Sequence, residues 1–185
     1  MLKVSPMKQA IFLLMFPFVF LSWTGTLKAD LLGDTIQFDY ATPDQNSSVF
    51  SESIVVVEGA TDEVGFTLIG DTFLVDPESD FIVFRLDFVP GTFFAGGEFN
   101  GAIISDLDFA DGQSLVGFTF ETDFAEFDAD RISFTSDSLA VNFSSIVPQT
   151  GSEFVRVNLI TVPEPNSCIL MTMAALLAFR RSKPI

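Results

Sequence analysis

Acidic residues gather at Asp106, Asp108 and Asp111, where their carboxylates could bind a hard cation. Calcium favours several oxygen ligands that converge on one turn, and Gly112 follows as a turn residue would. The third acid comes one position later than in an EF-hand loop, and the twelfth position is Gly117 rather than Glu. An irregular Ca²⁺ site is therefore one hypothesis for this stretch. The sequence favours a second interpretation, in which these acids form a solvated edge that discourages strand pairing.

Groups that serve as nucleophiles or general bases are scarce. The chain has no His, its single Cys is Cys168, and no Lys lies between residues 30 and 161. A serine nucleophile would lack its usual base, and one Cys cannot form an intramolecular disulfide. A pair of carboxylates could hydrolyse a glycosidic bond, but the many Asp and Glu residues offer no way to choose a pair. We therefore expect a protein that is not an enzyme and has no cofactor besides the hypothesised Ca²⁺.

The charge of residues 30–161 is strongly negative. This range contains 24 Asp and Glu residues but only three Arg, which gives it a net charge of −21. Such a field repels phosphate groups, so the sequence excludes nucleic acid as a partner. The chain is nevertheless rich in apolar residues, with 23 Phe among them, so its composition is typical of a folded domain rather than a disordered one.

Short runs rich in β-branched and aromatic residues, separated by Gly, Pro, Asp and Ser, fill residues 30–161. The run at 35–40 alternates apolar and polar residues with a period of two, and the run at 81–88 is typical of a central strand. Eight or nine strands are predicted, with candidates at 35–40, 53–57, 65–69, 81–88, 102–107, 114–120, 131–134, 139–143 and 154–160. The pattern predicts an all-β fold, an antiparallel β-sandwich with jelly-roll or immunoglobulin-like topology, with Phe side chains filling its core.

The first 29 residues have the three-part pattern of a secretory signal peptide. Lys3 and Lys8 precede an apolar run from Ala10 to Trp23, and small or polar residues follow it. The pattern predicts cleavage after Ala29, so that the exported domain comprises residues 30–161. An uncleaved N-terminal anchor is the alternative, and in either case the domain is exported.

The C-terminal residues 162–185 combine three parts in order. Val162-Pro163-Glu164-Pro165 is followed by an apolar run at 168–179 and then by Arg180-Arg181. The prolines favour an extended backbone, and the arginines resist translocation across a membrane. The apolar run has 12 residues, about 18 Å as a helix, against a hydrocarbon thickness of about 30 Å. This short transmembrane helix suits a temporary anchor better than a permanent one. A buried C-terminal helix of the domain is the alternative.

This tail resembles the PEP-CTERM sorting signal of exported bacterial proteins. The resemblance implies that an exosortase, a membrane-embedded protease of the transpeptidase type, recognises Pro163, Glu164 and Pro165. It also implies that Arg180 and Arg181 form the cytoplasmic stop. Members of this group occur in bacteria that make extracellular polysaccharide.

We therefore expect a secreted, acidic, non-enzymatic protein that is held in the membrane through its C-terminal helix until it is processed. It would then reside at the cell surface or in the extracellular matrix, with extracellular polysaccharide as a possible partner. The alternative is a Ca²⁺-assisted module that binds carbohydrate or matrix through the acids between Asp106 and Asp130.

Overall fold

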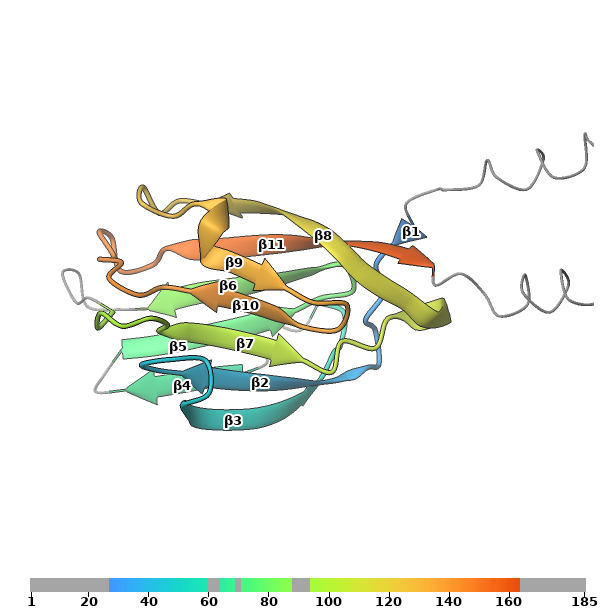
Figure 1. Cartoon of the computed structure of the whole chain (residues 1–185), viewed down its shortest axis with the longest axis horizontal. Coiled ribbons are helices and arrows are strands. Elements are labelled where there is room, and N and C mark those ends of the chain that lie inside the picture. The colour runs from blue at the N-terminus through green and yellow to red at the C-terminus, as the bar shows by residue number, and fades with distance from the viewer. Residues whose placement is uncertain (1–26, 60–63, 69–70, 88–93, 164–185) are drawn as a thin grey trace, which may run out of the picture.

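The strands of the chain pair into two antiparallel sheets that pack face to face (Figure 1). The structure is a computed structural model, and it describes residues 27–59, 64–68, 71–87 and 94–163. The predicted all-β sandwich is confirmed. Every strand pair in the described residues is antiparallel.

The larger sheet is built around the last strand, β11. Its order is β8-β11-β6-β5-β4, and the short β1 pairs with β11 beyond the end of β6. Its strands are β1 (Leu27–Lys28), β4 (Val64–Leu68), β5 (Asp71–Pro77), β6 (Phe81–Asp87), β8 (Gln113–Thr122) and β11 (Phe154–Pro163). The run predicted at 81–88 is indeed the middle strand of this sheet, and its side chains at 82–84 are all buried.

The second sheet has the order β3-β2-β7-β10-β9. Its strands are β2 (Thr35–Ala41), β3 (Ser48–Val55), β7 (Gly101–Ser105), β9 (Ile132–Phe134) and β10 (Leu139–Asn142). Two single 3-10 turns, η1 (Ala110–Gly112) and η2 (Ala129–Arg131), precede β8 and β9. The strand order separates the β2–β3 and β9–β10 hairpins at opposite edges of the sheet, with β7 between them.

Aromatic rings join the two sheets, as the Phe excess predicts. Nine Phe side chains belong to the buried set. Phe73, on β5, stacks on Phe38 of the opposite sheet at 6.2 Å between ring centroids and meets Tyr40 edge-on at 5.5 Å. Phe143, just after β10, meets Phe73 edge-on at 5.5 Å and stacks with Phe94 at 5.3 Å. Large rings in such geometries fill the space between sheets and add about 0.5–1.5 kcal/mol per pair beyond the burial of their area.

The edge strand β3 carries a charge on its inner side. Cross-strand neighbours lie on the same side of a sheet, and Glu52 is opposite Phe38, whose side chain is fully buried. Glu52 is itself exposed, although Phe50 and Ile54 on the same side of β3 pack on the core. A charge in this position hinders pairing of the open edge with another strand.

Glu153 closes the loop that leads into β11. Its side chain is 2 % exposed, and one carboxylate oxygen accepts hydrogen bonds from the backbone N–H groups of Gln149 and Thr150 (2.6 Å for Thr150). The other oxygen accepts from the N–H of Gly151 at 2.9 Å. Burial alone would raise the pKa of this carboxyl, but the backbone hydrogen bonds from Thr150, Gln149, Glu153 itself and Gly151 outweigh burial and lower the pKa.

Candidate functional site

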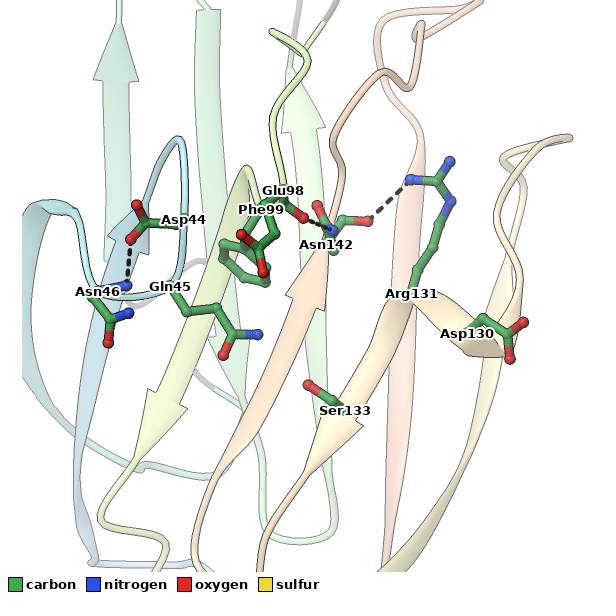
Figure 2. A pocket seen from close by; sticks show the side chains of 9 residues that line it. All are labelled: Asp44, Gln45, Asn46, Glu98, Phe99, Asp130, Arg131, Ser133 and Asn142. Carbon is green, nitrogen blue, oxygen red and sulfur yellow. Dashed lines mark hydrogen bonds between the residues drawn. The ribbon is translucent and has the colours of Figure 1, made fainter.

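A polar pocket lies at one end of the second sheet, where β2 and β10 end and β7 begins (Figure 2). The register brings these points together, because Gly101 pairs with Ala41 on one side and with Asn142 on the other. The pocket has a volume of about 450 Å³. Its lining residues come from four separate segments: Asp44, Gln45, Asn46, Glu98, Phe99, Asp130, Arg131, Ser133 and Asn142.

Close backbone approach fixes two walls of the pocket. The N–H of Phe99 donates to the carbonyl of Pro43 at 2.9 Å, which joins the 94–100 segment to the β2–β3 loop. A Cβ atom on Gly97 would lie only 2.9 Å from that same carbonyl oxygen, so the approach requires glycine. Asp44 shapes the loop itself, because its carboxylate accepts from the N–H of Asn46 at 2.9 Å and from the hydroxyl of Ser47 at 3.1 Å.

Asn142 fixes the third wall. Its side-chain N–H group donates to the carbonyl of Glu98 at 3.1 Å, and its side-chain oxygen accepts from the N–H groups of Asn100 (3.1 Å) and Ser144 (2.9 Å). The guanidinium of Arg131 donates to the carbonyls of Ser144 at 2.9 Å and Asn142 at 3.4 Å, which anchors η2 beside β10. The side chains of Asn142 and Arg131 therefore hold the backbone segments that line the pocket.

A buried polar pair lies beneath the same loops. The hydroxyl of Tyr40 donates to the side-chain oxygen of Asn100 at 2.6 Å, and the side-chain N–H group of Asn100 donates to the carbonyl of Ala95 at 3.0 Å. Burial raises the pKa of Tyr40, so the phenol stays protonated and keeps its role as donor. This pair holds the loop that carries Glu98 against the core.

Phe99 gives the pocket an apolar base. It packs with Ala41, Ile103 and Ala140 in a small cluster separate from the main core. These three residues alternate with inward-facing neighbours on their strands, so the cluster covers the outer side of the sheet. Only 3 % of Phe99 is exposed, so the ring supports the pocket without offering an open aromatic surface.

Five lining side chains make no hydrogen bond within the part of the protein that the structure describes: Gln45, Asn46, Glu98, Asp130 and Ser133. They comprise two amides, two carboxylates and one hydroxyl, which together supply both donors and acceptors. Figure 2 shows Gln45, Glu98 and Ser133 around the space over β10, with Asn46 to one side and the carboxylate of Asp130 on the other side, directed away from the rest. With Asp44, the pocket has three carboxylates against the single guanidinium of Arg131.

The residues of the hypothesised Ca²⁺ site lie at the opposite end of the sandwich, after β7. Asp106 and Asp108 are exposed, and the backbone of Asp106 is left-handed, with φ of 58°. The N–H of Asp108 donates to the carboxylate of Asp34 at 2.9 Å. The side chain of Asp111 lies outside the described residues. Among the residues that the structure does describe, no three acidic, His or Cys side chains form a group that could hold a metal ion.

Two of the predicted processing residues, Ala29 and Pro163, lie at this end too. Pro163 is the last residue of β11 and pairs with Gln113, while Glu164, Pro165, Arg180 and Arg181 lie outside the described residues. Within residues 27–163 as described, no helix has the length and apolar character needed to cross a membrane. Ala29, the predicted cleavage residue, is 1 % exposed and belongs to the core, directly after β1. Cleavage after Ala29 would therefore remove β1 and this buried side chain from the sandwich.

The pocket is absent from the sequence-based hypotheses. Its residues are spread from position 44 to position 142, and no spacing along the chain links them. The one local signal is the run Asp44-Gln45-Asn46-Ser47, which indicates a turn and nothing about its neighbours. The chain matches no protein-family model, no curated protein and no solved structure.

Proposed function

We propose that this chain is an exported, non-enzymatic β-sandwich that a PEP-CTERM tail delivers to the cell envelope or extracellular matrix after processing by an exosortase. The observation that carries the proposal is the position at which the sandwich ends. β11 finishes at Pro163, so the last paired residue in the described part of the chain is the first residue of the Pro-Glu-Pro motif.

This boundary suits a sorting signal. A protease needs an extended segment outside the fold, and Pro165 and Pro163 disfavour helix at the residues that precede them. A cut beyond Pro163 would leave all the strand pairs of β11 intact, because its pairing with β8 already ends there. The sandwich would therefore survive removal of the tail.

The fold also places the polar pocket and the C-terminal end of β11 at opposite ends of the sandwich. β11 runs from the pocket end of the sandwich to the end where β1 and the 106–112 loop lie (Figure 1). The N–H of Ala110 donates to the carbonyl of Asp30 at 2.9 Å, so the start of the domain and that loop meet at this same end. A sandwich anchored through its C-terminus would thus direct the polar pocket away from the membrane, toward the surrounding polysaccharide.

Intact mass spectrometry of the protein from its own host tests the proposal. We expect a mass that lacks both the leader and the residues beyond the motif. Deletion of the exosortase should restore the mass of the tail and retain the protein in the membrane fraction. A Glu164→Ala variant should behave in the same way, whereas Glu126→Ala, an exposed change far from the motif, should be processed normally. Unchanged processing in the exosortase deletion would refute the proposal.

A further inference from the structure

We propose that the polar pocket lined by Gln45, Asn46, Glu98, Asp130 and Ser133 binds a neutral saccharide, such as one or two residues of an uncharged polysaccharide chain, without calcium. The inference concerns the domain itself and does not rest on how the tail is processed.

The unused hydrogen-bonding groups match the chemistry of sugar hydroxyls. Each hydroxyl can donate one hydrogen bond and accept others, and the carboxylates of Glu98 and Asp130 are acceptors only. The amides of Gln45 and Asn46 add donors as well as acceptors, and the hydroxyl of Ser133 can act as either. An array of this kind offers partners to several hydroxyls at once, whereas an apolar ligand would use none of these five groups.

The pocket is also preorganised. Asn142, Arg131 and Asp44 use their side chains to hold backbone segments rather than to face a ligand. The Phe99–Pro43 hydrogen bond then locks the two loops to each other. Little loop entropy remains to be lost on binding, which favours affinity. The volume of about 450 Å³ falls in the range of small-molecule sites, about 300–1,000 Å³.

Charge selects against other ligands. Three carboxylates against one guanidinium, in a domain with a net charge of −21, repel uronic acids, sulfated sugars and phosphates. A divalent cation is also disfavoured, because no three acidic side chains of the described residues come together as metal ligands. A neutral polyhydroxylated chain remains the class that uses the acceptors without this penalty.

The affinity should be modest. The ring of Phe99 is 97 % covered, so stacking on a sugar ring contributes little, and hydrogen bonds exposed to water contribute most of the binding. We expect a Kd of about 1 mM for a neutral hexasaccharide.

Saturation-transfer NMR and calorimetry on the processed protein from its host would test the site. The probes are maltohexaose and cellohexaose, a neutral galactan oligomer, an anionic oligogalacturonate and a cationic chitosan hexamer, each with EDTA present. We expect at least one neutral probe to bind, and the anionic probe not to bind.

Two variants connect binding with the pocket. Gln45→Ala combined with Asn46→Ala should weaken binding about tenfold, and Ser133→Ala a few-fold, because each removes partners of the ligand. Ser136→Ala, an exposed change in the β9–β10 turn at the other end of the sheet, is the matched control and should bind normally. Circular dichroism would verify that every variant is folded.

Three results would overturn the inference: none of the neutral probes binds, only the chitosan hexamer binds, or folded pocket variants bind as well as the unchanged protein. Normal tail processing alongside any of these results would leave the sorting proposal standing, so the two ideas fail separately.

Discussion

Replacing Glu153 with Gln should destabilise the protein markedly, although the two side chains have almost the same shape. The side chain is buried, and its carboxylate accepts hydrogen bonds from three backbone N–H groups of the loop, those of Gln149, Thr150 and Gly151. The substitution keeps one oxygen acceptor but turns the other into an N–H donor that opposes an N–H of the loop.

The size of the effect follows from these contacts. The hydrogen bonds from Gln149 and Thr150 would then have a neutral amide oxygen as acceptor in place of a charged carboxylate, at a cost of about 1 kcal/mol each. The N–H of Gly151 would lose its acceptor, at a cost of about 1–3 kcal/mol. The free energy of unfolding should therefore fall by about 3–5 kcal/mol, a large part of the 5–15 kcal/mol of a typical domain. Urea unfolding at pH 7, followed by circular dichroism, measures it directly.

The same residue should make stability depend on pH. Since the pKa of Glu153 is lower in the folded protein than in the unfolded chain, its carboxylate stabilises the fold above the unfolded pKa, about 4.3. That contribution is lost as pH falls through the folded pKa. The Gln variant lacks this titration, so its deficit relative to the unchanged protein should shrink as the pH is lowered below about 4.

An exposed carboxylate from the same region serves as the control. Glu126→Gln should change the free energy of unfolding by less than about 0.5 kcal/mol, as surface substitutions usually do. A deficit below about 1 kcal/mol for Glu153→Gln, or one that stays constant between pH 7 and pH 3, would show that the carboxylate does not hold the loop as described.

Three further changes test the fold. Glu52→Val should cause concentration-dependent association in analytical ultracentrifugation, because the edge strand β3 loses its inward charge; a monomer at all concentrations would contradict this. Phe143→Ala should lower the free energy of unfolding by about 3–5 kcal/mol in urea titrations, since several rings pack on it, and a cost under about 1.5 kcal/mol would contradict that role. Gly101→Ala should prevent folding, because the new Cβ would lie 2.0 Å from the carbonyl oxygen of Val141. Gly117→Ala should fold, because its Cβ would lie 3.9 Å from the side chain of Ile160; equal behaviour of the two variants in circular dichroism would refute this reasoning.

The fold class could be predicted because most strands leave a local signature. The alternation at 35–40 and the apolar run at 81–88 correspond to β2 and β6. The prediction lacks β5 (Asp71–Pro77). Its apolar residues, Phe73, Leu74 and Val75, are consecutive and lie between Asp71 and the buried Asp76, so the sequence shows no alternation of apolar and polar residues there. β3 starts at Ser48 rather than at 53, since its first half is exposed and has little apolar alternation. Pairing with β2, not local preference, makes that half a strand.

The pocket could not be predicted, for a different reason. A sequence shows what each residue can do but not which distant residues share a sheet register. Asn142 and Gly101 become neighbours only because β10 and β7 pair. In the sequence Asn142 is one more polar residue near a predicted strand end, and only the structure shows its three hydrogen bonds to backbone groups. The Ca²⁺ hypothesis, by contrast, depends on a local order of acids and a following Gly112 that only partly matches a calcium loop and that a solvated loop can also have.

The place of β11 in the larger sheet has a consequence for how the chain is made. β8, β6 and β1 all pair with β11, which is the last described strand to leave the ribosome. Until residue 163 has been synthesised, these three strands lack their common partner, so no early part of the chain can complete the larger sheet. Most contacts of such a topology are distant in sequence and form late and slowly. If the chain is exported as proposed, its larger sheet would be completed only once β11 has emerged on the far side of the membrane.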